Sequence, residues 1–125
     1  MKIKSGRKSG FTLVEIMIVV AILGMLLAMA IPYYVRARAN SQCRACINNM
    51  RQIDGAIQQW AVENRMKAGD TATYPDDLIP YIHLNAAGEI PPCPAGGDYS
   101  VAALGIIPPV NCTVANTVQP PHLLP

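Results

Sequence analysis

The longest apolar stretch of the chain, Phe11 to Ile31, constrains the fold more than any other feature. It holds twenty-one residues and a single charged side chain, Glu15. A helix rises about 1.5 Å per residue, so this stretch is long enough to cross roughly 30 Å of hydrocarbon. An ionisable group inside such a span is costly unless it finds a partner, which makes Glu15 a candidate functional residue. The alternative is a carboxylate that reaches the membrane interface from near the end of the span.

The residues before this stretch form a short basic leader containing Lys2, Lys4, Arg7 and Lys8. The whole chain carries a net charge of +2, but without the leader six basic residues face eight acidic ones, which leaves −2. The leader is therefore expected to stay in the cytoplasm, and the remainder is not expected to bind nucleic acid. The alternative is an ordinary secretory signal cut after Ala30. Against it, the apolar run is longer than usual, and Ile31 continues the helical pattern.

The string Gly10-Phe11-Thr12-Leu13-Val14-Glu15 resembles the processing site of type IV prepilins and of the pseudopilins of type II secretion. The resemblance covers about the first quarter of the chain. It implies that a prepilin peptidase cuts between Gly10 and Phe11 and that the new N-terminal residue, Phe11, is methylated. It makes Glu15 the fifth residue of the mature chain, and it places Gly24 and Pro32 where many family members carry glycine and proline.

The predicted fold class is α+β: a long N-terminal transmembrane and amphipathic helix, followed by a small C-terminal domain that contains a β-hairpin, as in type IV pilins. The expected segments are the leader (1–10), the transmembrane and filament-core helix (11–31), its amphipathic continuation (32–67) and a small disulfide-containing domain (68–125). Gly24 is a weak helix former, and Pro32 lacks a hydrogen-bond donor and clashes with the preceding turn. A break or kink is therefore predicted between them.

From Tyr33 to about Arg65 the apolar residues recur at spacings of three and four, which predicts one apolar stripe on a helix. The stripe consists of Cys46, Met50, Ile53, Ile57 and Trp60, with Cys43 and Ile47 beside it. Without tertiary partners it would face water, so the C-terminal part of the chain is expected to cover it. The helix is expected to end between Lys67 and Gly69, with Gly69 as its left-handed cap.

The C-terminal part differs in composition, because ten of the eleven prolines lie after Asp70. The segment 74–78 predicts a turn leading into a short helix. Residues 98–101 and 112–114 predict two short strands joined by a loop over 102–111. A two-stranded hairpin is marginal alone. Leu78, Tyr99, Val101 and Val114 are therefore expected to pack on the helix stripe.

The four cysteines, in a chain with an export anchor, suggest an oxidising destination and allow three complete pairings. Cys93 and Cys112 flank the predicted hairpin. A disulfide between them is predicted to stabilise the domain by about 3 kcal/mol. Cys43 and Cys46 form a C-x-x-C without the strand–helix–strand context of a redox motif, so a structural use is favoured. Three alternatives stay open for these two: a local pair, reduced thiols on the apolar face, or exchange with Cys93 and Cys112.

No enzymatic, metal or cofactor site is predicted. His83 and His122 lack metal-like spacing with a second ligand and are interpreted as surface or packing residues. Some pseudopilins similar to this chain bind calcium in acidic loops, but no EF-hand spacing occurs here. Solvated turn residues are therefore the prediction for Asp70, Asp76, Asp77, Glu89 and Asp98. The sequence also contains no P-loop, no Ser-His-Asp set and no paired-carboxylate site.

The predicted function is that of a structural subunit of a type IV pilus-like filament. The precursor is expected in the bacterial inner membrane, and the mature subunit in an extracellular pilus whose core is built from the 11–31 helices. Glu15 is expected to meet the Phe11 amine of a neighbouring subunit. The implied partners are further copies of the chain, the prepilin peptidase, the inner-membrane assembly machinery and, before assembly, the membrane. The alternatives are a type II secretion pseudopilin in a short periplasmic filament, or a minor pilin or adhesive binding module.

Overall fold

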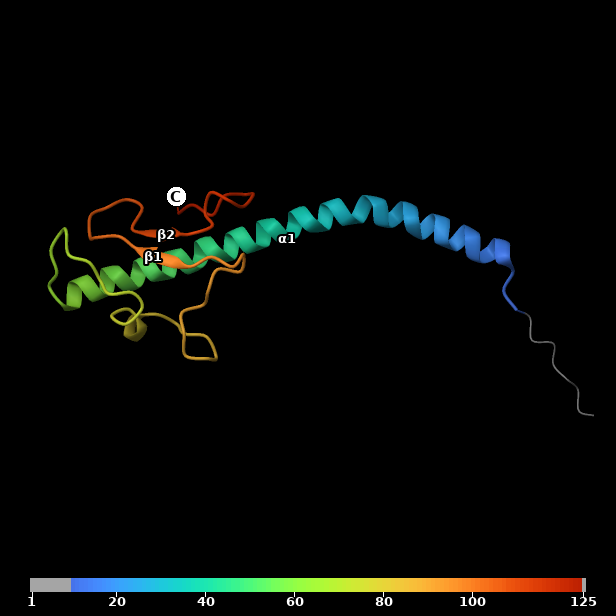
Figure 1. Cartoon of the computed structure of the whole chain (residues 1–125). Coiled ribbons are helices and arrows are strands. Elements are labelled where there is room, and N and C mark those ends of the chain that lie inside the picture. The colour runs from blue at the N-terminus through green and yellow to red at the C-terminus, as the bar shows by residue number, and fades with distance from the viewer. Residues whose placement is uncertain (1–9, 125) are drawn as a thin grey trace, which may run out of the picture. The chain divides into compact units, whose positions relative to one another are not determined.

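A computed structural model describes residues 10–124, and one long helix dominates it (Figure 1). The elements are the helix α1 (Leu13–Glu63), the short 3₁₀ helix η1 (Ile79–Tyr81) and the strands β1 (Tyr99–Val101) and β2 (Val110–Cys112). The predicted α+β class is confirmed. The leader, apart from Gly10, lies outside the described residues.

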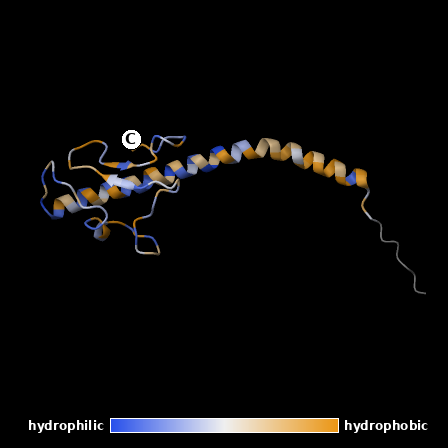
Figure 2. Ribbon diagram, viewed as in Figure 1, coloured by the Kyte–Doolittle hydropathy of each residue, from blue (hydrophilic) through white to orange (hydrophobic). Residues whose placement is uncertain are grey.

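The chain divides into two compact units between Arg36 and Ala37, within α1. In the first unit, the apolar side chains of α1 are exposed all round, from Leu13 at 75% to Val35 at 59%. Figure 2 shows this part of α1 as almost continuously hydrophobic. It is long and apolar enough to cross a membrane. The helix continues through Gly24 and Pro32, so an interruption there stays a prediction for the assembled state.

In the second unit, one face of α1 forms one side of the hydrophobic core. Cys46, Met50 and Ile53 are fully buried there. The rest of the predicted stripe, Ile57 and Trp60, is buried with them. Of the two residues beside the stripe, Cys43 is buried and Ile47 is partly buried against the same cluster. Figure 1 shows β1 and β2 lying along the C-terminal half of α1. The side chains expected to cover the stripe do so: Leu78 and Tyr99 are buried in the same cluster, and Val101 and Val114 pack against it.

The two strands form an antiparallel pair with Tyr99 opposite Cys112 and Val101 opposite Val110. The predicted second strand, over 112–114, was placed too late in the sequence: β2 ends where that strand was expected to begin. After Cys112 the chain turns, because the Ala115 N–H donates to the Cys112 carbonyl at 3.0 Å. The β-favouring Thr113 and Val114 are therefore part of a turn, not of a ladder.

The predicted turn and short helix after Tyr74 are confirmed. The Leu78 N–H donates to the Pro75 carbonyl at 3.0 Å, and η1 follows directly. The Thr73 N–H donates to the Asp77 carboxylate at 2.8 Å, which ties the start of this turn to its end.

The C-terminus of α1 differs from the prediction, because Gly69 is not its cap. The Met66 N–H donates to the Ala61 carbonyl at 2.9 Å, and the Arg65 N–H to the Val62 carbonyl at 3.3 Å. This pair of bonds is a Schellman motif, which requires a left-handed residue between helix and loop. Arg65 fills that place with φ of 54°. Gly69 lies in the following loop, where its N–H donates to the Leu104 carbonyl at 2.9 Å.

Arg65→Gly should raise the free energy of unfolding of the C-terminal unit by about 0.5–1 kcal/mol, because glycine adopts the left-handed conformation without the steric cost of a Cβ. Arg51→Gly, the same exchange at an exposed position inside α1, should lower it by about 1 kcal/mol. Thermal unfolding of the full chain in detergent, followed by circular dichroism, compares the two. Destabilisation of equal size by both exchanges would contradict the assigned cap.

Candidate functional site

The first candidate site is the start of α1, where Thr12 and Glu15 hold each other. The Glu15 N–H donates to the Thr12 hydroxyl at 3.2 Å, and the Thr12 N–H donates to the Glu15 carboxylate at 3.4 Å. This reciprocal pair is a capping box, and it satisfies two N–H groups that a helix otherwise leaves without partners. It also places the negative carboxylate at the positive end of the helix dipole. The spacing Thr-x-x-Glu was visible in the sequence, but this local role of Glu15 was missed.

The residues on either side of the predicted cleavage bond are open to solvent. Phe11 is 80% exposed. A Cβ built on Gly10 would meet no atom within 4 Å. The structure therefore leaves this peptide bond accessible, and the flanking glycine presents no side chain to an approaching enzyme.

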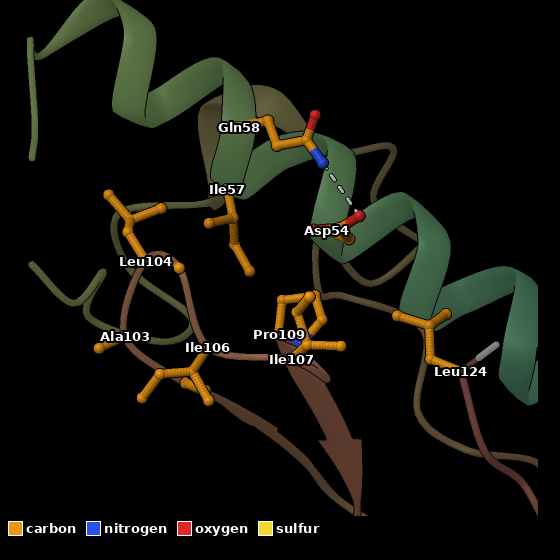
Figure 3. Close-up of a pocket in the computed structure, with 11 residues that line it drawn as sticks. Asp54, Ile57, Gln58, Ala103, Leu104, Ile106, Ile107, Pro109 and Leu124 are labelled. Carbon is orange, nitrogen blue, oxygen red and sulfur yellow. Dashed lines mark hydrogen bonds between the residues drawn. The ribbon is translucent and has the colours of Figure 1, made fainter. Parts of the chain in front are cut away.

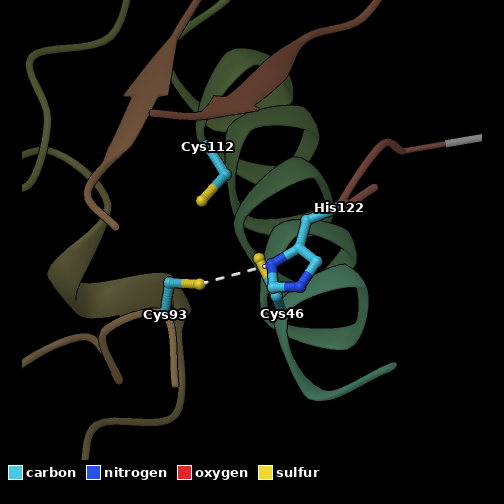
Figure 4. Close-up of side chains that lie close together, drawn as sticks. All are labelled: Cys46, Cys93, Cys112 and His122. Carbon is cyan, nitrogen blue, oxygen red and sulfur yellow. Dashed lines mark hydrogen bonds between the residues drawn. The ribbon is translucent and has the colours of Figure 1, made fainter. Parts of the chain in front are cut away.

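The second candidate site is a buried cluster of three cysteines and one histidine in the C-terminal unit. Cys46 comes from α1, Cys93 from the loop before β1, Cys112 from the end of β2 and His122 from the C-terminal segment. Their sulfur and imidazole nitrogen atoms all lie within 4.8 Å of one another. Figure 4 shows the four side chains pointing toward a common centre, with Cys93 Sγ 3.5 Å from His122 Nδ1. At most 5% of any of these four residues is exposed.

Polar groups around the cluster fix its members in place. The Tyr99 hydroxyl donates to Cys46 Sγ at 3.7 Å and accepts a hydrogen bond from the Asn49 amide at 3.2 Å. The backbone N–H of His122 donates to the Ala115 carbonyl at 2.9 Å, which anchors the segment that carries the imidazole.

The thiols of the cluster titrate differently because their surroundings differ. Burial raises the pKa of Cys46 to about 12. Burial also acts to raise the pKa of Cys93, but hydrogen bonds from the backbone of Ala95 and Gly97 and from Cys46 more than offset it, so that this pKa is lowered. For Cys112, burial outweighs the hydrogen bond from the Val114 backbone, and the pKa is raised. Cys93 is therefore the thiol that most readily becomes a thiolate.

A cavity of about 400 Å³ lies beside α1 in the same unit, and apolar side chains line most of it (Figure 3). Its two polar side chains are hydrogen-bonded to each other, since the Gln58 amide donates to the Asp54 carboxylate at 3.1 Å. The remaining lining residues are aliphatic, proline or glycine, among them Ile57, Leu104, Ile106 and Leu124. These lining residues include no nucleophile or acid–base pair.

The sequence predictions for these residues meet the structure in different ways. Cys93 and Cys112 come together as predicted, but as free thiols, so the disulfide between them stays a prediction. Cys46 and His122 join them, which the sequence analysis missed. Cys43 stays outside the cluster, and its thiol donates to the Pro121 carbonyl at 3.4 Å. A spacing motif could not have revealed this set, because its four members come from four separate segments.

Comparison with known proteins bears on the first candidate site, the start of α1. Residues 5–31 match the family model described as the prokaryotic N-terminal methylation motif. The chain is 35% identical over 88 residues to the fimbrial protein EcpC of Eikenella corrodens, covering 65% of this chain and 57% of that protein. It is 45% identical over 57 residues to the type IV major pilin protein PilA of Myxococcus xanthus, covering 46% of this chain and 26% of that protein.

A further relative is the type II secretion system core protein G of Klebsiella pneumoniae, 29% identical over 58 residues, covering 46% of this chain and 41% of that protein. The chain thus spans about half the length, or less, of the relatives it matches. No solved structure matches it. The methylation motif, the exposed apolar helix that follows it and these relatives lead to one conclusion: the chain carries a prepilin-type N-terminus and is similar to type IV fimbrial proteins and to a type II secretion core protein.

Proposed function

We propose that this chain is a structural, non-enzymatic subunit of a type IV pilus-like filament. The observation that carries the proposal is the first part of α1, where apolar side chains are exposed all round directly after the methylation motif. Such an apolar surface is unfavourable in water and has to be buried against lipid or protein. Lipid buries it before assembly, and neighbouring copies of the same helix bury it afterwards. Apolar burial favours this packing once the helix has left the bilayer.

In the proposed pathway the precursor sits in the bacterial inner membrane with its basic leader in the cytoplasm. A prepilin peptidase cuts between Gly10 and Phe11 and methylates the new amine of Phe11. The assembly machinery of the inner membrane then moves subunits into the filament. The accessible Gly10–Phe11 bond supports the first of these steps.

The second candidate is a pseudopilin that forms a short periplasmic filament. The similarity to core protein G of a type II secretion system supports it, although identity to the fimbrial proteins is higher. Deletion of the gene separates the two: loss of surface filaments supports the pilus, and loss of protein secretion with normal surface filaments supports the pseudopilus. A minor pilin or adhesive module remains the third alternative.

Gly10→Leu should trap the uncut precursor in the membrane, because a bulky side chain would occupy the open space beside the cleavage bond. Gly6→Leu, the same exchange four residues earlier in the leader, should leave cleavage intact. Intact-mass spectrometry of membrane and filament fractions measures the mature N-terminus, which is expected to be N-methylated Phe11. Filaments built from subunits that still contain Met1 to Gly10 would overturn the processing site.

Glu15→Gln should leave membrane insertion and cleavage largely intact but severely reduce filament assembly. The proposed reason is a charge pair between Glu15 and the Phe11 amine of a neighbour, whose loss leaves a buried, unpaired charge that costs about 3–5 kcal/mol. Glutamine also completes a capping box, so this exchange removes the charge and keeps the cap.

Thr12→Ala is the matched control for Glu15, because it removes the capping hydroxyl, at about 1 kcal/mol, and keeps the charge. Filament yield from sheared cells, with total mature subunit measured in parallel, compares the two variants. Thr12→Ala should assemble far better than Glu15→Gln. Normal yield from cells that make only the Glu15→Gln subunit would defeat the charge pair.

In the filament we expect the helix to be interrupted between Gly24 and Pro32, where a weak helix former and a helix breaker bracket the segment. Pro32→Ala restores the missing donor and should lengthen the ordered helix. Electron cryo-microscopy of both filaments checks this, and continuous helical density through these residues in the wild type would contradict it.

A further inference from the structure

We propose that Cys46, Cys93, Cys112 and His122 bind a structural zinc ion that ties together the C-terminal unit. This inference does not rest on the proposed filament function. It rests on the four donor atoms, which lie within 4.8 Å of one another and are sealed from solvent.

The donor set matches the ion in type and number. Zinc in structural sites is held by four ligands, commonly three cysteines and one histidine, at about 2.3 Å for sulfur and about 2.0–2.1 Å for nitrogen. A tetrahedron with these bond lengths separates its ligand atoms by about 3.5–3.8 Å. Cys93 Sγ and His122 Nδ1 are already 3.5 Å apart. The wider pairs need to close by about 1 Å or less.

Backbone amides support the two loop cysteines in the same way. Cys93 and Cys112 each begin a backbone turn of the same kind. Each cysteine carbonyl accepts from the N–H three residues on, at 2.9 Å for Gly96 and 3.0 Å for Ala115. Two matching turns thus hold Cys93 and Cys112 in place, as surrounding hydrogen bonds do for metal ligands.

The chain packs tightly around Cys112 between these turns. A Cβ on Gly97 would lie 2.8 Å from Cys112 Sγ and 2.6 Å from a Val114 methyl carbon, so only glycine fits beside this sulfur. A disulfide would use two of the sulfurs and leave the third thiol and the buried imidazole facing it. Zinc uses all four donors.

On binding, the three thiols each release one proton to solvent, and the neutral imidazole donates a nitrogen lone pair. The ion and three thiolates together carry a charge of −1. No oxidation or reduction takes place. The ion would join α1, the loop before β1, the end of β2 and the C-terminal segment, in a unit whose sheet has two strands of three residues.

The test uses the full chain, purified in detergent under reducing conditions without chelator, with zinc measured by inductively coupled plasma mass spectrometry. We expect one zinc ion per chain. Cys46→Ser, Cys112→Ser and His122→Ala should each lose most of it. Cys43→Ser is the matched control, since Cys43 is a buried cysteine one helical turn from Cys46 that lies outside the cluster, and it should keep the ion.

A second measurement covers the case in which a ligand variant fails to fold. Cobalt added to the metal-free wild-type chain should give the intense visible bands of a tetrahedral site and a thiolate-to-cobalt charge-transfer band. Removing zinc with a chelator should lower the unfolding midpoint by about 10 °C or more. A chain that is metal-free as purified and binds cobalt without thiolate bands would overturn the proposal, and so would a Cys93–Cys112 disulfide peptide in chain purified without reductant. Filament yield is not a readout here, so failure of this proposal and failure of the filament role are distinguishable.

Discussion

The second unit depends on the burial of one face of α1 beneath chain that has almost no regular structure. Met50 and Ile53 are fully buried, yet the sheet that covers them has two strands of three residues each. Loops and turns cover the rest of this face. Their backbone groups form hydrogen bonds between residues far apart in sequence, as between the Gly69 N–H and the Leu104 carbonyl. Such cover contributes little stability of its own. The apolar stripe therefore supplies most of the driving force, and specific links such as the cysteine–histidine cluster determine which loop lies where.

Periodicity predicted what depends on local sequence, and it missed what depends on tertiary contacts. The spacing from Cys46 to Trp60 identified the buried face, and the Gly10–Glu15 string identified the N-terminal methylation motif, because both signals lie in neighbouring residues. The cap at Arg65 was missed because the left-handed position after α1 is filled by a residue other than glycine. The role of His122 was missed for a related reason. Only the folded loops bring its imidazole to three sulfurs that are far away in sequence.

The start of α1 shows how one carboxylate can serve two environments. In the isolated subunit Glu15 is exposed and bonded to the Thr12 backbone, a contact that glutamine could also make. The helix therefore requires a hydrogen-bond acceptor at this position but no charge. A strict requirement for glutamate would have to come from something outside the subunit, and the Phe11 amine that the proposed cleavage creates is a group of opposite charge that each neighbour would bring.

The bond between the Cys43 thiol and the Pro121 carbonyl joins residues 78 positions apart, and Tyr99 reaches back 53 positions to Cys46. Contacts of such long range form late, because a large loop must close before they contribute. During synthesis and export, the apolar face of α1 is therefore complete well before the segments that cover it arrive. In that interval the face exposes the apolar side chains that later lie in the core. The order of events on the folding pathway then becomes as important to this small protein as its final packing.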